Sequence, residues 1–403
     1  MTVAAPPIKA DRPTDEELTA RVHSLGEIIR ANGPQGESDR RIPEATIQAL
    51  SQQGLFRLGT PRRYGGYETS VKTMLDVSSA IAEYDGATAW VSTLINVTTW
   101  GAALFGSAAR EEVFGDNPDA KVSGVGSSPL AEIKQAEGGL RVSGRWYYNS
   151  GGLHSDWVLL GMVRTDDNGT MVGHNSVLIP RNEVDIEETW FVAGMRGTGS
   201  NCVVADNVFV PEHRVANTLD FVEGHFINEH ADEEPFYRSA WQPVLALVLV
   251  GPQLGMAREA FRLVASQAEK RAISMTFYEK ERDSVGFQLQ IARAKMMIES
   301  AHLHAYRAAA DIDRAAAANE YPDNLLRSRI RADCGWAVEH VRDAIQLLID
   351  ANGAGSFAES NPLQRIWRDC NVGGHHALTN YAINYEIYGK QLLGVETPIV
   401  PTI

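Results

Sequence analysis

The segment GMRGTGSNCVVADNVFVPEH, residues 194–213, decides how this sequence is interpreted. It begins with a glycine-rich turn and continues as a β-branched run that ends in Val-Pro, a pattern that predicts a strand. A glycine pattern can hold a phosphate when it lies between a strand and the start of a helix. This pattern lies between two predicted strands and starts no helix, so it does not indicate a dinucleotide-binding domain.

Short β-branched and aromatic runs surround this segment from residue 120 to 232, with Gly, Asn or Pro between them. No helical pattern separates these runs, so we expect a compact antiparallel barrel or sandwich. The residues on both sides have helical periodicity. The expected fold class is therefore α+β: a disordered tail at 1–14, an N-terminal helical domain at 15–119, a β domain at 120–232 and a C-terminal four-helix bundle at 233–403.

Local signals place the helices within these regions. Thr14 precedes acidic residues as an N-cap, and Gly33 before Pro34 is expected to end the first helix. Residues 73–106 are apolar and rich in Ala, and they predict a buried helix pair divided near Asp85 and Gly86. Four further helical segments, 254–272, 287–318, 325–353 and 363–394, predict the bundle.

The composition excludes several classes of protein. The 403 residues are 44% hydrophobic and 22% charged, and the net charge of −14 opposes binding to nucleic acid or to anionic membranes. The apolar run 241–255 is interrupted by Pro252 and two glycines, so we expect no membrane span. The first residues lack an export-signal pattern, and Cys202, Cys334 and Cys370 form no disulfide framework. We therefore expect a reducing cytoplasm.

Two adjacent histidines, His375 and His376, occur in RIWRDCNVGGHHALTN, residues 365–380. On a helix, adjacent side chains point about 100° apart, whereas paired metal ligands usually lie at i and i+4. We therefore expect no metal site. From the residues alone, His376 is either a packed helix histidine or an imidazole that titrates near the working pH.

Three motifs, in this order, resemble the acyl-CoA dehydrogenase fold. TPRRYGGYE (60–68) is similar to a turn of that superfamily, GMRGTGSNCVVADNVFVPEH resembles its β-domain signature, and NPLQRIWRDC (361–370) is similar to the segment before its last helix. The dehydrogenases commonly carry a glutamate base seven or eight residues after the Arg-Asp pair. Here those places hold His376 and Ala377, and the next carboxylate is Glu386. The dehydrogenation step needs such a base.

More narrowly, the chain resembles the flavin-dependent monooxygenases built on that fold, the oxygenase components of two-component systems. Members of that branch carry a histidine at the place of His376 and a W-x-x-x-S-G motif, which WYYNSGG at 146–152 fits. The resemblance implies that reduced FMN, with FAD as the alternative, comes from a separate NAD(P)H-flavin reductase. It reacts with O2 through a C4a-(hydro)peroxyflavin to hydroxylate an aromatic, polycyclic or heteroaromatic small molecule. The resemblance also implies a homotetramer, a dimer of dimers.

The resemblance also implies roles for particular residues. His376 and Ser150 are the expected catalytic residues, with a packed histidine and a turn serine as the alternatives. Expected cofactor contacts are Ser127, Tyr148, Asn149, Arg196, Thr198, Ser200, Arg271, Gln288, Gly355 and Ser356, where Arg271 and the loop 353–362 hold the phosphate from a neighbouring subunit. Expected substrate contacts are Asn96, Thr98, Trp100, Trp190, Phe236 and Trp241, which would suit a large aromatic or polycyclic substrate.

Strand alternation places Trp146 and Tyr148 on one face and Tyr147 on the other. Many relatives carry a histidine near the place of Asn96 and Thr98, and this chain does not, so specificity for phenolic acids is not carried over. Three other functions stay open: an acyl-CoA dehydrogenase that uses FAD, an S- or N-monooxygenase of the same branch, and a non-catalytic flavin-binding assembly protein.

Overall fold

The computed structural model describes residues 12–165, 171–225 and 234–403, so most of the predicted tail at 1–14 lies outside the described residues. The N-terminal helices are α1 (Asp15–Ser24), α2 (Gly26–Asp39), α3 (Glu44–Gln52), α4 (Val71–Ala82), α5 (Gly86–Ala103) and α6 (Ser107–Phe114). Asp85 caps α5, because its Oδ2 accepts the Thr88 N–H at 2.9 Å. The predicted division of the apolar segment near Asp85 is confirmed.

The first predicted helix does not end at Gly33. It breaks at Leu25, and α2 continues through Pro34 to Asp39. A Cβ at Gly33 would lie 2.7 Å from Asp85 Oδ1 and 2.8 Å from Arg365 Nη2. This helix is therefore packed closely against other parts of the chain, and such tertiary contacts outweigh a local Gly-Pro stop signal.

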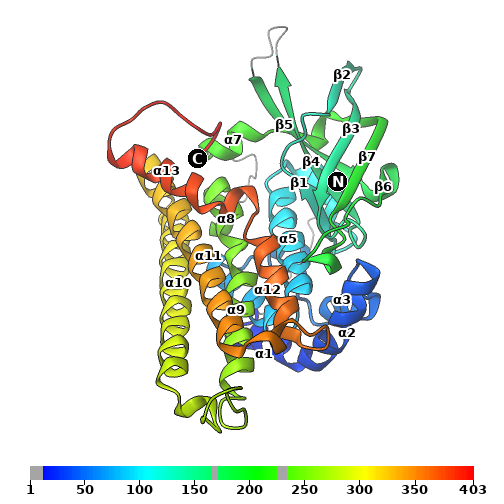
Figure 1. The fold of residues 1–403 in the computed structure, drawn as a ribbon. Helices are drawn as coiled ribbons and strands as arrows, with labels where there is room; N and C mark the ends of the chain where they lie inside the picture. Colours follow the sequence, from blue (N-terminus) through cyan, green and yellow to red (C-terminus); the bar gives the residue numbers. More distant parts are fainter. Residues whose placement is uncertain (1–11, 166–170, 226–233) are drawn as a thin grey trace.

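Two four-stranded sheets form the β region (Figure 1). The strands are β1 (Val122–Val125), β2 (Glu132–Ala136), β3 (Gly139–Asn149), β4 (Trp157–Thr165), β5 (Met171–Pro180), β6 (Asp185–Glu187), β7 (Asn201–Pro211) and β8 (Val215–Asn217). Their orders are β1-β4-β5-β8 and β2-β3-β7-β6. Trp146, Leu160 and Val203 belong to one apolar core shared by the two sheets, so the arrangement is a sandwich.

One strand pair departs from the antiparallel expectation. β1 and β4 run parallel, with Val122 opposite Trp157, whereas the other pairs within the described residues are antiparallel. Parallel neighbours need a long crossover connection. Here the chain supplies it by leaving for the second sheet through β2 and β3 before it returns as β4.

The C-terminal region is helical. Its helices are α7 (Thr218–Glu223), α8 (Trp241–Val248), α9 (Val250–Ala265), α10 (Val285–Ala317), α11 (Asn324–Asn352), α12 (Pro362–Gly373) and α13 (Tyr381–Leu392). The long helices α9, α10 and α11 lie side by side in Figure 1. The predicted single helix at 363–394 is wrong, because the chain leaves helical geometry between α12 and α13, where the two histidines lie.

Helices α8 and α9 follow each other almost without a break. By length and composition the stretch Trp241–Ala265 is apolar enough to cross a membrane, but 83% of its most apolar window is buried inside the protein. The sequence predicted that Pro252 interrupts this stretch. It does not, because it lies in the first turn of α9, where proline is tolerated. Its hydrophobicity is that of a core helix.

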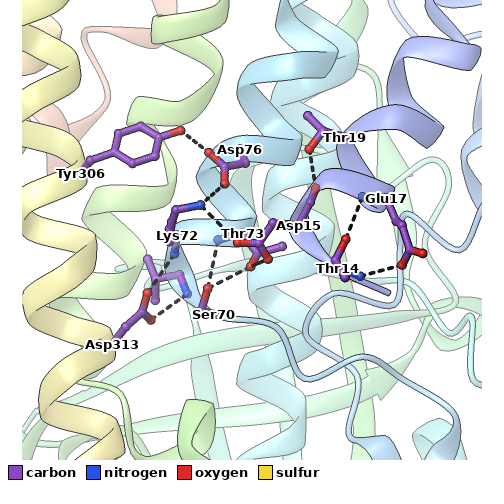
Figure 2. A network of polar contacts seen from close by, with 11 residues as sticks. Thr14, Asp15, Glu17, Thr19, Ser70, Lys72, Thr73, Asp76, Tyr306 and Asp313 are labelled. Atoms are coloured by element: carbon purple, nitrogen blue, oxygen red, sulfur yellow. Dashed lines mark hydrogen bonds and ion pairs between the residues drawn. The ribbon is translucent and has the colours of Figure 1, made fainter. Parts of the chain in front are cut away.

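A polar network fixes the N-terminal helices on the bundle (Figure 2). Asp313 of α10 accepts the N–H groups at the start of α4, from Val71 at 2.9 Å and Lys72 at 3.1 Å. The Lys72 ammonium group pairs with Asp76 at 2.6 Å, and Tyr306 of α10 donates to the same carboxylate. Burial raises the pKa of Asp313 to about 6. This network joins α4 to α10.

Candidate active site

A chain of hydrogen-bonded side chains lies where α5 meets the ends of β3 and β7. The Trp90 indole N–H donates to Ser150 Oγ at 3.3 Å. Ser150 Oγ lies 2.6 Å from Ser200 Oγ, which lies 2.7 Å from Thr198 Oγ1. All three hydroxyl-bearing residues are buried. The motifs WYYNSGG and GMRGTGS therefore meet through their hydroxyl groups.

Met195 anchors the far end of this chain. Its carbonyl oxygen accepts the Thr198 hydroxyl and the Trp190 indole N–H, each at 2.8 Å. Its φ of 52° is left-handed, which is uncommon for a residue with a side chain. The Met195 peptide is therefore held in one orientation, and its carbonyl oxygen faces the hydroxyl chain.

The Arg-Asp pair of α12 holds this loop against the bundle. Asp369 accepts the Met195 N–H, and Arg368 donates to the Ala193 carbonyl oxygen at 2.5 Å. Gly194 lets the loop approach, because a Cβ there would lie 2.3 Å from the Arg368 carbonyl oxygen. Burial raises the pKa of Asp369 to about 7. The motif thus positions the GMRGTGS loop.

His376 lies at the break between α12 and α13 and not on a helix. It caps a short 3-10 helix, Ala377–Thr379, where its Nδ1 accepts the Leu378 N–H at 3.2 Å. In the neutral ring the proton is therefore on Nε2. Burial, with a smaller effect of Arg331, lowers the pKa of His376 to about 4. The prediction that this imidazole titrates near neutral pH was wrong, and the half-buried ring is a neutral N–H donor.

Trp90 joins His376 to the hydroxyl chain. The rings of Trp90 and His376 meet edge to face with centroids 6.0 Å apart, and the same indole donates to Ser150. His375 is exposed, and its Nδ1 lies 2.6 Å from the Asn371 carbonyl oxygen. The two histidines therefore have different surroundings and do not form a common site.

Gln253 of α9 is a candidate site residue that the sequence analysis missed. Its side chain is 0% exposed, and neither amide atom has a hydrogen-bond partner. A Cβ at Gly373 would lie 2.5 Å from Gln253 Nε2 and 3.2 Å from the Trp90 ring. A buried unpaired amide costs about 1–3 kcal/mol. A single Gln or Trp in an apolar helical pattern gives no sequence signal for a site.

A β-bulge changes the aromatic faces that strand alternation predicted. The register between β3 and β7 shifts between Trp146 and Asn149, and Tyr148 has a left-handed φ of 70°. Trp146 is buried in the sandwich, whereas Tyr147 and Tyr148 are both exposed, so Trp146 and Tyr148 do not share a face. Tyr148 instead packs against Trp190, with ring centroids 6.0 Å apart.

Most of the predicted substrate residues belong to the core. Trp100 stacks on Phe236 at 5.2 Å and on Trp241 at 5.3 Å, and all three side chains are buried. Thr98 lies against Gly124 of β1. In the structure these residues pack against one another or against β1, and their substrate contact stays a prediction. Among the predicted substrate residues, Trp190 is brought to the hydroxyl chain.

Asn96 is also committed to packing. Its Oδ1 accepts the Leu58 N–H at 3.1 Å, and its Nδ2 donates to the carbonyl oxygens of Leu55 and Ser92 at 2.8 and 3.0 Å. The cavity beside it measures about 10 Å³, which is room for one water molecule and not for an aromatic ring. The hydrogen bonds of Asn96 tie α5 to the segment 55–58, and the substrate contact of Asn96 stays a prediction.

The predicted phosphate residues gather at the opposite end of the bundle. Arg271 binds the Asn352 side chain and its carbonyl oxygen, and Ser356 Oγ accepts from Asn352 Nδ2 at 2.8 Å. Gly355 precedes Ser356 in the 3-10 turn Ala354–Phe357, and Gln288 is exposed at the start of α10. Within one chain this group is separate from Ser150, so it contacts the same cofactor only if a second subunit brings it there.

Two further predicted cofactor residues, Asn149 and Arg196, adjoin the hydroxyl chain, and a third, Ser127, is not brought to it by any contact in the described residues. Asn149 precedes Ser150, is 1% exposed, and has no partner for either amide atom. Arg196 is half-buried beside Thr198, and its Nε has no partner. Ser127 is exposed after β1. Asn149 and Arg196 therefore have unsatisfied polar atoms at the site, whereas Ser127 does not.

The donor set fits a flavin. The ring system of a flavin has polar atoms along its edge and two apolar faces. The amides of Asn149 and Gln253 and the Arg196 Nε are buried polar atoms without partners, and Tyr148 and Trp190 are aromatic surfaces beside the same loop. These residues would hold the polar edge and the faces of such a group.

Comparisons with known proteins identify relatives along nearly the whole chain. Residues 247–381 match the family model described as acyl-CoA dehydrogenase, C-terminal domain. The flavin-dependent monooxygenase, oxygenase subunit HsaA of Rhodococcus jostii (strain RHA1) is 33% identical over 95% of this chain and 99% of its own length. The p-hydroxyphenylacetate 3-hydroxylase, oxygenase component of Acinetobacter baumannii is 27% identical over 94% of this chain and 89% of its own length.

Solved structures show the same similarity. XiaF from Streptomyces sp. in complex with FADH2 and glycerol has a TM-score of 0.90 and 37% identity, and the match covers 96% of this chain and 98% of that one. The HsaA monooxygenase from M. tuberculosis has a TM-score of 0.89 and 30% identity, with coverage of 96% and 99%. The predicted acyl-CoA dehydrogenase-like fold is confirmed.

Proposed function

The chain belongs to the flavin-dependent monooxygenase oxygenase components, and from this we propose that it uses reduced flavin and O2 to hydroxylate an aromatic or polycyclic substrate at the Ser150–His376 site. Three of the curated relatives are named for hydroxylated or fused aromatic substrates: p-hydroxyphenylacetate, resorcinol and indole-3-acetate. An aromatic substrate also agrees with the exposed Tyr148 ring, which packs against the half-buried Trp190.

The observation that carries the proposal is the replacement of a base by an imidazole. Glu386, the next carboxylate after the Arg-Asp pair, is exposed on α13, whereas His376 is half-buried against Trp90. Asp369 is buried but is occupied by the Met195 N–H. This arrangement offers no free carboxylate, among these candidates, to remove a substrate α-proton, so it disfavours the acyl-CoA dehydrogenase alternative.

The chain's own residues supply binding, orientation and hydrogen bonds. A bound reduced flavin supplies the electrons that activate O2. The neutral His376 ring offers an Nε2–H donor for an oxygen atom, and the buried Ser150 hydroxyl offers an acceptor. Gln253 offers a donor and an acceptor within the apolar wall that Trp90 contributes. Burial of Ser150 and Gln253 excludes water, which strengthens the hydrogen bonds that these two side chains offer.

Incorporation of ¹⁸O from labelled O2 into a product tests this function. The protein is mixed with photoreduced FMN, ¹⁸O2 and a panel of resorcinol, indole and a naphthol, and products are analysed by mass spectrometry. We expect one labelled oxygen atom in a product. Flavin bleaching by an acyl-CoA, without labelled product, would instead establish the dehydrogenase. We also expect His376→Ala to reduce hydroxylation while H2O2 release persists, whereas unchanged coupling would remove His376 from the mechanism.

A separate reductase completes the proposed system. The relatives are named as oxygenase components or subunits, and we propose that an NAD(P)H-flavin reductase supplies the reduced flavin to this chain as well. The glycine pattern at 194–199 supports this, because it leads through a 3-10 turn into β7 and starts no helix for a nicotinamide cofactor. A cytoplasmic location, where NAD(P)H is produced, is part of the same proposal.

The proposed homotetramer is supported by an apolar stripe on α10. Leu289, Met296 and Leu303 are 67%, 68% and 69% exposed and occur at intervals of seven residues, so they lie on one helix face. A second copy packed there would bury this stripe. Light scattering tests the proposal: Leu303→Glu should lower the molar mass, whereas Leu130→Glu, an exposed leucine in the β region, should not. A monomeric wild-type protein would contradict it.

A further inference from the structure

We propose that Thr198 and Ser200 are positioning residues that fix Ser150 as a hydrogen-bond acceptor toward the bound ligand, and that this acceptor selects reduced over oxidised flavin. The inference rests on the proposed function, which places Ser150 beside the flavin. Its basis is the direction of each hydrogen bond in the chain from Met195 to Trp90.

The direction is fixed first at Met195. A carbonyl oxygen only accepts, so at 2.8 Å the Thr198 hydroxyl has to donate to it. If the Thr198 proton turned away, two oxygen atoms would face each other at that distance with no hydrogen between them. The Met195 carbonyl group does not turn to relieve this contact, because its oxygen also accepts the Trp190 indole N–H at 2.8 Å and the Thr198 backbone N–H at 3.2 Å.

This direction is transmitted along the hydroxyl groups. Thr198 has one hydrogen and uses it on Met195, so across the 2.7 Å contact Ser200 is the donor. Ser200 then has no hydrogen left for Ser150, so across the 2.6 Å contact Ser150 is the donor. The single Ser150 hydrogen therefore points to Ser200.

The far end of the chain agrees with this direction. Trp90 Nε1 is only a donor, so it occupies one lone pair of Ser150 Oγ at 3.3 Å. Ser150 thus donates to Ser200, accepts from Trp90, and has one lone pair free. A ligand beside Ser150 meets an acceptor and no donor.

This acceptor distinguishes the two redox states of a flavin. The reduced ring carries an N5–H donor, whereas the oxidised ring has an N5 lone pair, which would face the Ser150 lone pair without a hydrogen. One hydrogen bond in a buried site changes a binding constant roughly fivefold. We therefore expect the chain of hydroxyl groups to favour reduced FMN by about this factor or more.

Equilibrium dialysis under nitrogen tests the inference without catalysis. Dissociation constants of oxidised and photoreduced FMN are measured for the wild type, Thr198→Val and Ser200→Ala, and circular dichroism establishes that each variant is folded. Both variants release the Ser150 hydrogen, so it can turn toward the ligand. We expect the ratio of the oxidised to the reduced dissociation constant to fall roughly fivefold in each.

Two control variants leave the hydrogen-bond direction from Met195 to Ser150 unchanged. Thr198→Ser retains the donor, and Thr69→Val removes a buried threonine hydroxyl that donates to the Leu58 carbonyl oxygen at 3.1 Å outside the chain. Both should keep the wild-type ratio. An unchanged ratio in folded Thr198→Val and Ser200→Ala would overturn the inference alone, as would equal wild-type affinity for both flavin forms. A wild type that binds neither form would overturn the proposed function as well.

Discussion

His376→Asn is expected to change the pH dependence of stability in a defined window. Asparagine is a favoured N-cap residue, so it can still accept the Leu378 N–H, but it does not titrate. The pKa of His376 falls from 6.5 to about 4 in the folded chain. This difference of about 2.5 pH units corresponds to at most about 3 kcal/mol, and water at the half-buried ring reduces it.

The sign follows from where the proton binds. Above pH 6.5 neither state is protonated at His376, and the histidine contributes nothing to the pH dependence. As the pH falls from 6.5 to about 4, the unfolded state takes up a proton that the folded state does not, so the wild type loses stability. His376→Asn lacks this loss. Asp313, Asp369 and Glu68, whose pKa values are raised, titrate alike in both proteins and cancel in the difference.

The assay is urea unfolding of both proteins at several pH values between about 7 and about 4.5. The two free energies of unfolding should diverge in favour of the variant as the pH falls, by up to about 3 kcal/mol. His375→Asn, at the exposed neighbour, is the matched control and should run parallel to the wild type. Parallel curves for His376→Asn would refute the assignment of a neutral, buried imidazole.

Two further pairs of substitutions test the packing around the site, each measured by urea unfolding. Gly373→Ala places a Cβ 2.5 Å from Gln253 Nε2 and should lower the free energy of unfolding by about 1–3 kcal/mol. The control Gly389→Ala, in α13, has open space around the new Cβ and should raise the free energy of unfolding by about 0.5–1 kcal/mol. Changes of the same sign in the two variants would contradict this geometry. Asp369→Ala leaves the Met195 N–H unpaired and should lower the free energy of unfolding by about 1–3 kcal/mol. Asp369→Asn keeps an acceptor without a buried charge and should lower it by less than ~1 kcal/mol near neutral pH. An equal loss of stability in both variants would show that the hydrogen bond does not hold the loop.

The motifs predicted the fold and the parts of the site that depend on order along the chain. WYYNSGG and GMRGTGS carry local turn and strand signals and RIWRDC a helical one, and the structure joins the three through Ser150, Thr198, Ser200 and Asp369. In this fold, the order of the three motifs along the chain brings their segments together. The sequence therefore indicated which segments meet, although not which atoms.

The remaining errors concern features that tertiary contacts decide. Tyr148 leaves the strand alternation because a bulge lies between β3 and β7. His376 leaves the helix because α12 ends at Gly373, and its pKa follows from burial, which no local pattern reports. Trp100 and Trp241 stack on each other in the core, a contact between distant segments that no local pattern reports, and their substrate contact stays a prediction. Aromatic residues in an apolar helix do not reveal from sequence whether they contact each other or a ligand.

The most direct test of the account is a crystal structure of the FMN complex. The central claim is that an imidazole and a hydroxyl, rather than a carboxylate, face the reactive edge of the flavin. We predict that Ser150 and His376 contact that edge while Glu386 stays in solvent. A flavin with Glu386 or another carboxylate against its reactive edge, and His376 turned to solvent, would contradict the claim.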